Sequence, residues 1–127
     1  MAGAGSGWRD GHAHLTFDSD TGLPVRLPLE IARSYRARRK GLLGRTSLTG
    51  ALLLTPANSI HTFGMRIPID VAYLDRHLRV LSLHTMPPNR LGLPRLRARH
   101  VLEAEAGAMR SWGLRVGGVV GVEEGPA

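Results

Sequence analysis

The chain has 127 residues, no cysteine and a formal net charge of +7. This length suits one domain with one hydrophobic core, and the lack of cysteine excludes disulfides, thiolate zinc sites and thiol catalysis. No apolar run approaches the roughly 18 residues of a membrane-spanning helix. We therefore expect a single domain without a membrane span in a reducing compartment, the cytoplasm.

The positive charge comes almost entirely from arginine, because Lys40 is the one lysine among 17 basic residues. Such a charge is found in proteins that bind nucleic acid or anionic lipid surfaces, but also on basic surfaces that only contact water. The chain holds two residues each of Trp, Tyr and Phe, which are few for stacking on single-stranded nucleic acid. A solvated basic surface is the favoured interpretation, and nucleic acid is not the favoured partner.

The first half of the sequence predicts a hairpin, a helix and a buried strand. Residues 12–17 alternate in polarity, and a turn-rich segment joins them to residues 23–28, whose prolines favour an edge or interrupted strand. Residues 30–40 lack Gly and Pro and end in basic residues, which favours a helix with Gly41 as its C-cap. The apolar residues 51–55 predict a strand that is buried on both faces.

The second half predicts three strands, a short helix and a last strand. Residues 70–75 and 78–84 form a hairpin around the two-residue connection 76–77. Residues 86–94 contain three prolines and one glycine, so they form a loop long enough to cover a site. Residues 99–106 are a strand, 108–112 a short helix and 119–122 a final strand.

These elements predict a mainly β fold, a compact antiparallel β-sandwich or half-open barrel with one or two short helices. The domain is expected to span residues 11–122. Residues 1–10 are expected to be a flexible leader, because they lack the charged and apolar regions of a signal peptide. Residues 123–127 are expected to be a tail.

A series of short motifs crosses the chain from about Leu27 to Val120. The motifs are residues 39–45 (RKGLLGR), 50–54 (GALLL), 61–71 (HTFGMRIPIDV), 87–90 (PPNR), 101–107 (VLEAEAG) and 112–114 (WGL). In this order the series resembles the uncharacterised bacterial and archaeal family DUF192. Many members carry Trp-Met-Lys-Asn where this chain has Phe63-Gly64-Met65-Arg66, so that Met65 matches. The resemblance implies a compact β-sandwich or barrel-like fold and supplies no reaction.

Several residues near the third motif can carry chemistry. A carboxylate beside a histidine orients its tautomer, and an arginine can hold an anion through two parallel hydrogen bonds. We therefore expect a polar cleft between the segment His61–Asp70 and the loop Met86–Pro94. The candidate ligand-binding residues are His61, Met65, Arg66, Asp70, Arg90 and Glu103.

Three functions stay open. The first is a domain that binds a small ligand or a protein partner in that cleft. The second is a metal-assisted or acid-base enzyme that uses His61, Asp70 and Glu103. The third is a binder of nucleic acid or an anionic surface through Arg33–Arg45. For the first of these functions, we expect no cofactor and no resident metal.

The same polar residues also suit a structural network. Asp70 begins a strand after Pro68 and can accept hydrogen bonds from backbone N–H groups at a turn, and Glu103 can pair with an arginine. The sequence leaves open whether these residues form a site or a network, and it leaves the oligomeric state open.

Overall fold

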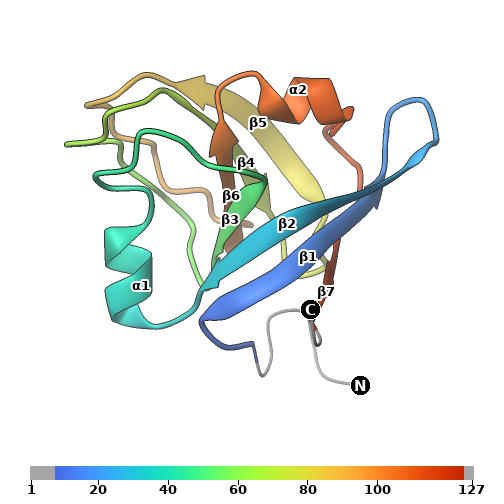
Figure 1. Cartoon of the computed structure of the whole chain (residues 1–127), viewed down its shortest axis with the longest axis horizontal. Coiled ribbons are helices and arrows are strands. Elements are labelled where there is room, and N and C mark those ends of the chain that lie inside the picture. The colour runs from blue at the N-terminus through green and yellow to red at the C-terminus, as the bar shows by residue number, and fades with distance from the viewer. Residues whose placement is uncertain (1–7, 125–127) are drawn as a thin grey trace.

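The structure is a computed structural model that describes residues 8–124. Most of the expected leader, residues 1–10, and residues 125–127 of the expected tail lie outside the described residues. Seven strands and two short helices follow one another along the described chain (Figure 1). They are β1 (Gly11–Asp18), β2 (Pro24–Ala32), α1 (Tyr35–Lys40), β3 (Ala51–Leu54), β4 (Ile69–Leu74), β5 (Val80–Met86), β6 (His100–Glu105), α2 (Ala108–Trp112) and β7 (Gly121–Glu123).

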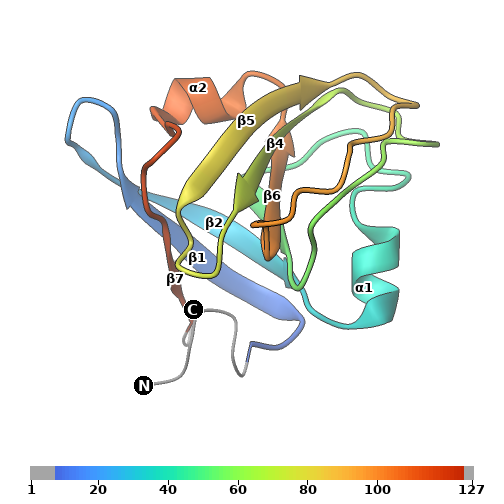
Figure 2. The ribbon, with the colours of Figure 1, turned by 180° about the vertical axis from the view of Figure 1, so that it is seen from behind.

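The strands form one sheet in the order β5-β4-β6-β3-β2-β1-β7. The β2/β3 pair is parallel and the other pairs are antiparallel. The sheet is not closed. Backbone hydrogen bonds between Val80 of β5 and residues Gly117 and Gly118, which precede β7, connect the two ends of the sheet. Seen from behind, β4 and β5 curl over β1 and β2 (Figure 2). The predicted mainly β fold with two short helices is confirmed, with one parallel pair within the sheet.

Side chains alternate between two hydrophobic clusters, one on each face of the sheet. Ala51 and Leu53 of β3 belong to the cluster inside the curved sheet, whereas Leu52 and Leu54 belong to a second cluster on the other face. The strand is buried on both faces, as predicted. The second cluster also holds Ile60 and is packed against the loops around α1. The candidate site lies on this second face.

The helix predicted over residues 30–40 begins later, at Tyr35. Residues 30–32 continue strand β2, because Glu30 and Ile31 pair with β1 and all three residues pair with β3. Both sets of backbone hydrogen bonds outweigh the helical propensity of this short stretch. Neither helix in the described part of the chain is long and apolar enough to cross a membrane.

Strand β2 is not an edge strand, contrary to the expectation from its prolines. It lies between β1 and β3, but its pairing with β3 begins only at Leu29. Pro28 therefore lies just before the doubly paired segment, where its missing N–H removes no hydrogen bond to β3.

Helix α1 depends on a hydrogen bond at its first turn. The Ser34 hydroxyl accepts a hydrogen bond from the Ala37 N–H at 3.1 Å. Substitution of an N-cap serine by alanine costs about 1 kcal/mol. We expect Ser34→Ala to lower the free energy of unfolding by about that amount in urea denaturation, and Ser34→Asp to retain most of it. A loss in Ser34→Asp equal to that in Ser34→Ala would contradict this role.

Candidate functional site

The site is built around a carboxylic acid in the middle of the sheet. Glu103 lies on β6 between Leu52 of β3 and Val71 of β4, and only 1% of the residue is exposed. Its buried Oε1 has no hydrogen-bond partner among the described residues. Burial raises the pKa of Glu103 to about 8, because removing water destabilises the charged form. At neutral pH the group is mainly a neutral acid that can donate and accept hydrogen bonds.

A cavity of about 140 Å³ extends from this carboxyl group toward the surface. Its walls are largely apolar. A Cβ atom built on Gly41 would lie 3.9 Å from Glu103 Oε1, so the backbone after α1 passes close to the acid. The apolar lining residues are Leu43, Leu54, Ile60, Phe63 and Met65.

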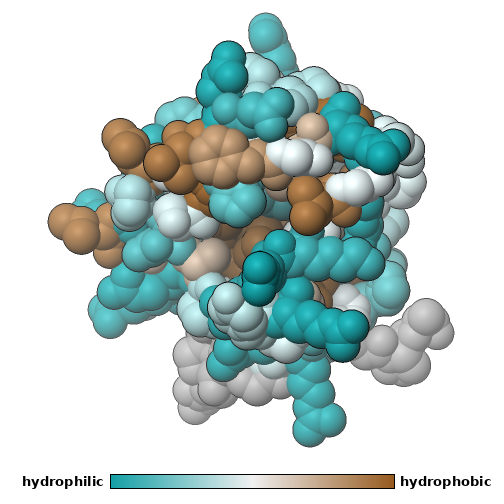
Figure 3. All heavy atoms as spheres, turned by 90° about the vertical axis from the view of Figure 1, so that its left-hand side faces the viewer, coloured by the Kyte–Doolittle hydropathy of each residue, from teal (hydrophilic) through white to brown (hydrophobic). Residues whose placement is uncertain are grey.

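The rim of the cavity is basic. Arg38, Arg39 and Lys40 of the last turn of α1 contribute to the lining, together with His61. The His61 ring stacks on Phe63, with 5.1 Å between ring centroids. Figure 3 shows this side of the molecule, where hydrophobic side chains are visible between hydrophilic ones. The rim repels cations and attracts anions.

An open groove of about 720 Å³ adjoins the cavity. The two share Arg38, Arg39, Leu54 and Ser59 as lining residues. A ligand that is too large for the cavity can therefore extend into the groove.

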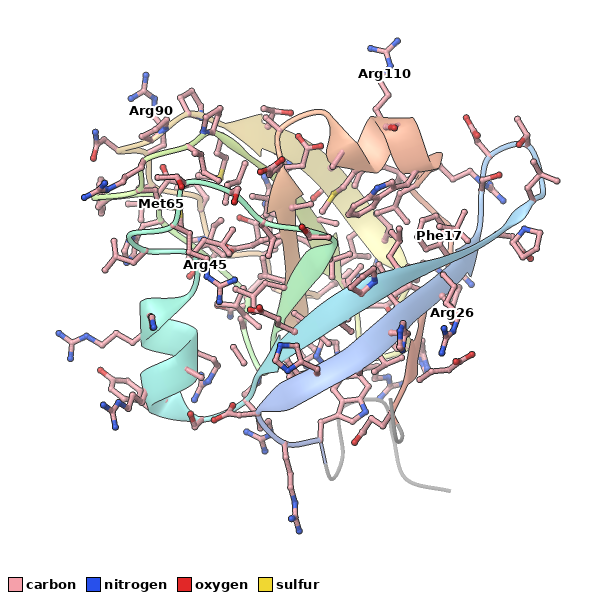
Figure 4. All side chains as sticks on the ribbon, viewed as in Figure 1. Phe17, Arg26, Arg45, Met65, Arg90 and Arg110 are labelled. Carbon is pink, nitrogen blue, oxygen red and sulfur yellow. The ribbon has the colours of Figure 1, made fainter. Side chains whose placement is uncertain are left out.

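Three of the six predicted ligand-binding residues lie at this cavity: His61, Met65 and Glu103. Figure 4 shows Met65 above Arg45, on the α1 side of the molecule. The predicted cleft between His61–Asp70 and Met86–Pro94 differs from this geometry, because no residue of that loop lines the cavity. The loop Met86–Pro94 instead runs beside the segment His61–Asp70, and an isolated β-bridge pairs His61 with Leu91.

The two predicted anion clamps are exposed and do not line the cavity. Arg66 and Arg90 both lie in loops, and the Arg90 side chain points away from the body of the domain (Figure 4). Within the described residues, the Arg90 guanidinium donates a hydrogen bond to the Asn89 carbonyl oxygen at 3.4 Å. Neither arginine is placed to hold a ligand against Glu103.

Asp70 is on the opposite face of the sheet from Glu103. Its Oδ1 accepts a hydrogen bond from the Thr85 hydroxyl at 2.7 Å. Its Oδ2 accepts from the N–H groups of Gly107 and Met109 at 3.0 and 3.1 Å. Asp70 therefore fixes the turn into α2, which is the structural role that the sequence left open as an alternative.

The proposed metal or acid-base set of His61, Asp70 and Glu103 is not brought together. Asp70 is separated from the other two by the sheet. Among residues 8–124, no group of three or more His, Asp or Glu side chains has the geometry of a metal site.

The basic segment Arg33–Arg45 is partly committed to structural contacts. Arg45 makes two hydrogen bonds to the Glu30 carboxylate, at 3.1 and 2.7 Å. This bidentate contact lowers the pKa of Glu30 and raises that of Arg45. Arg38 donates to the carbonyl oxygens of Arg33 and Pro56. The segment thus holds the helix against its surroundings as well as contributing charge.

Most of the lining residues are not among the six sequence candidates, and Gly41, Leu54 and Ile60 are examples. The sequence indicates only a helix cap at Gly41, and the two apolar residues carry no chemical signature. The one usable signal was Glu103, a carboxyl group on the same strand face as Val101. An ionisable residue on a strand face that packs into a core indicates a function or a buried partner.

The fold and this site define a small mainly β domain with an open mixed sheet and a cavity that ends in a buried acid. The family model for DUF192, described as "Uncharacterized ACR, COG1430", matches residues 16–122. The chain belongs to this family.

Curated relatives agree with this assignment. The chain is similar to UPF0127 protein PH1112 of Pyrococcus horikoshii, with 33% identity over 88 residues, or 65% of this chain and 76% of that protein. UPF0127 protein TK1120 of Thermococcus kodakarensis is 31% identical over 98 residues, 72% of this chain and 62% of that protein. These relatives are archaeal.

Two solved structures share the fold. A protein of unknown function from Novosphingobium aromaticivorans has a TM-score of 0.75 at 23% identity, covering 95% of this chain and 93% of that one. A protein from Sinorhizobium meliloti, provisionally described as a transcription regulator, has a TM-score of 0.77 at 17% identity, covering 91% and 96%. At these identities the likeness concerns the fold alone.

Proposed function

We propose that this domain binds a small neutral organic molecule whose hydrogen-bonding head group reaches Glu103. The observation that carries this proposal is the buried, unpartnered Oε1 of Glu103 at the end of a cavity. A buried polar atom without a partner costs roughly 1–3 kcal/mol of stability. A bound ligand that supplies the missing hydrogen bond would recover part of that cost.

The chemistry of the cavity favours a carbonyl or carboxamide head group. A neutral carboxylic acid donates one hydrogen bond and accepts another, as a carboxamide does in the complementary sense. A cationic head group would have to deprotonate Glu103 and pass Arg38, Arg39 and Lys40 at the rim. An anionic head group would lose its hydration in an apolar cavity.

The dimensions limit the enclosed part of the ligand. A cavity of about 150 Å³ in another protein accepts benzene. The cavity at Glu103 is about 140 Å³, so it suits one ring or a short aliphatic chain. Larger ligands would extend into the adjoining groove along Arg38 and Leu54.

A catalytic role for the site is the second candidate. The pKa of about 8 places Glu103 near the range in which a general acid or base works best at neutral pH. His61 at the rim is a further group that can exchange protons. Such an enzyme would use Glu103 with His61, without Asp70.

The proposal can be tested with three probes of the same shape and different charge: benzamide, benzoate and benzamidine. We expect benzamide to bind best at pH 6.5, benzoate less well and benzamidine least. Chemical-shift changes in the ¹⁵N spectrum should centre on Gly41, Ile60, Met65 and Glu103.

Two variants distinguish the acid from its surroundings. Glu103→Leu removes the hydrogen-bonding group and should lower the affinity for benzamide at least tenfold. Glu105→Gln is the matched control, because Glu105 lies on the same strand face but outside the cavity, where its Oε1 accepts from the Leu48 N–H. Equal benzamide binding by Glu103→Leu and Glu105→Gln, or strongest binding of benzamidine, would contradict the proposal.

We further propose that the protein acts in the cytoplasm. The absence of cysteine in the whole sequence supports this location, since extracellular domains of small size often depend on disulfides. Fractionation of cells that produce the tagged full-length protein would test it.

A further inference from the structure

The charge of the protein is concentrated in one part of the chain. Residues 31–102 contain 13 of the 17 basic residues and only two of the 10 acidic ones, Asp70 and Asp75. Asp70 is buried, so that it does not offset the surface charge. This part of the chain includes α1 and the long loops before β4 and β6, which lie together on one side of the molecule (Figures 1 and 2).

The same loops expose large hydrophobic side chains. In the loop between β5 and β6, Leu91, Leu93 and Leu96 are 65%, 70% and 93% exposed. Phe63 in the preceding loop and Leu43 after α1 are also about half exposed. Five large hydrophobic side chains thus protrude from neighbouring loops, and exposed hydrophobic side chains that gather in one region mark interaction surfaces.

Three of these side chains, Leu43, Phe63 and Leu91, are connected through neighbouring residues. Leu43 reaches Gly64, since a Cβ atom on that glycine would lie 3.2 Å from Leu43 Cδ1. Phe63 stacks on His61, and His61 pairs with Leu91. Figure 3 shows hydrophobic side chains gathered across the upper part of this side of the molecule. We call the exposed hydrophobic side chains Leu43, Phe63, Leu91 and Leu93 the loop apolar surface; Leu96 lies apart from it, beside Arg76 and Leu81.

Arginines lie between and beside these hydrophobic residues. Arg90, Arg95 and Arg97 alternate with the three leucines in the loop between β5 and β6. The Arg95 guanidinium lies over the Tyr73 ring and hydrogen-bonds to His84 Nε2, whereas Arg66 and Arg90 are exposed in loops. Leucine and arginine side chains thus occur together on protruding loops.

We propose that the loop apolar surface attaches the domain to an anionic lipid bilayer. The leucines and Phe63 would enter the headgroup region, where apolar side chains leave water. The arginines would contact the lipid phosphates, because the negative surface potential of an anionic bilayer attracts nearby basic side chains. This inference is independent of the ligand in the cavity.

The hydrophobic side chains favour a bilayer over nucleic acid as the anionic partner. Nucleic-acid binding draws on basic side chains and on aromatic rings that stack on bases. Neither interaction would bury Leu91, Leu93 or Leu96. A bilayer accommodates both the leucines and the positive charge.

Flotation of the full-length protein with vesicles tests the inference. Vesicles of phosphatidylcholine with about one third phosphatidylglycerol should bind the protein, and pure phosphatidylcholine vesicles should bind it at least tenfold more weakly. Binding should fall as sodium chloride is raised. Leu91→Ser combined with Leu93→Ser should lower the affinity for the anionic vesicles about tenfold or more.

A matched pair of substitutions controls for lost hydrophobic surface. Leu23 and Val116 are 66% and 57% exposed and lie outside the loop apolar surface, so Leu23→Ser with Val116→Ser should leave vesicle binding within about twofold of the wild type. Arg66→Gln with Arg90→Gln should weaken binding more than Arg110→Gln with Arg115→Gln, which removes the same net charge.

Two results would overturn the inference. One is equal vesicle binding by the Leu91/Leu93 and Leu23/Val116 double variants. The other is binding to a single-stranded RNA homopolymer that is tighter than vesicle binding and unchanged in the Leu91/Leu93 variant, which would assign the charge to nucleic acid.

Discussion

Replacement of Glu103 by leucine is expected to make the protein more stable, by about 1–3 kcal/mol near pH 4.5, where the acid is neutral in both states, and by more at pH 7. The wild-type side chain is 1% exposed, and its Oε1 has no hydrogen-bond partner among the described residues. Leucine removes an unpaired buried polar group and adds apolar surface beside Leu54 and Ile60. Urea denaturation at pH 4.5 and at pH 7 measures the difference.

The gain in stability is expected to increase with pH. The pKa of Glu103 is about 8 in the folded protein and near its ordinary value of 4.5 in the unfolded chain. Between these two values the folded state binds the proton more tightly, so this group stabilises the fold fully below pH 4.5 and progressively less up to pH 8. The wild type should lose roughly 1 kcal/mol per pH unit from this group within that window.

The variant Glu103→Gln separates charge from polarity. Its amide cannot ionise, so it should abolish the pH dependence that Glu103 contributes while it keeps a polar group in the cavity. The free energy of unfolding of Glu103→Gln should therefore exceed that of the wild type only slightly at pH 5, and the difference should grow toward pH 8. A stability difference between Glu103→Leu and the wild type that is constant from pH 5 to pH 8 would show that Glu103 is ionised or has an ordinary pKa.

Stabilising substitutions occur at many positions, so a more stable Glu103→Leu variant supports a functional role only together with a loss of binding. If Glu103→Leu is both more stable and unable to bind benzamide, the two measurements together support a binding site. If it is more stable and binds benzamide normally, the acid has another role. The stability measurement alone does not depend on the identity of the ligand.

The order of the elements was predictable because the local signals are strong. Alternation, turn residues and the apolar run at residues 51–54 identified the strands, and both helices were expected. The start of α1 was wrong, because residues 30–32 join two neighbouring strands that are distant in sequence. The parallel β2/β3 pair was also not predicted, since local sequence patterns do not specify which strands become neighbours.

The strand that follows Arg76-His77 begins later than predicted for a local reason. Leu78 has a positive φ of 64°, and the Asp75 carboxylate accepts hydrogen bonds from the N–H groups of His77 and Arg79. The turn therefore extends to Arg79, and β5 begins at Val80. A positive φ at leucine is rare enough that sequence reasoning would not propose it.

The site was predictable only in part. Strand alternation placed Glu103 on the same face as Val101, and the DUF192-like motif indicated His61 and Met65. Nothing in the sequence indicated that Asp70 would face the opposite side. Its position follows from the register of β4 against β6, in which Asp70 pairs with Ala104 and Val71 with Glu103. Neighbours across this pair lie on the same face, so Asp70 shares its face with Ala104 and not with Glu103.

Asp70 is therefore expected to matter for stability and not for ligand binding. Its two oxygens accept three hydrogen bonds, from the Thr85 hydroxyl and the N–H groups of Gly107 and Met109. Asp70→Ala removes both acceptor oxygens and leaves the buried Met109 N–H without a partner. Hydrogen bonds to a charged group each contribute about 1.5–3 kcal/mol, and the Thr85 hydroxyl can rotate to another partner, so the loss of the two N–H bonds is expected to lower the free energy of unfolding by about 3–6 kcal/mol.

Asparagine at position 70 provides the matched control. Its carbonyl oxygen can take the place of Oδ2 and accept from Gly107 and Met109, while its NH₂ group donates to the Thr85 hydroxyl, which can reverse its role. Asp70→Asn should therefore lose only about 1 kcal/mol, the difference between charged and neutral hydrogen bonds. Urea denaturation of the two variants, at the same pH, measures both values.

The same two variants distinguish a structural aspartate from a catalytic or ligand-binding one. Asp70→Asn should bind benzamide as the wild type does, since the carboxylate lies across the sheet from the cavity. If Asp70→Asn lost binding while remaining folded, Asp70 would act on the ligand through the sheet. If Asp70→Ala were as stable as Asp70→Asn, the turn before α2 would not depend on this carboxylate, and α2 would be held by the packing of Met109 in the core.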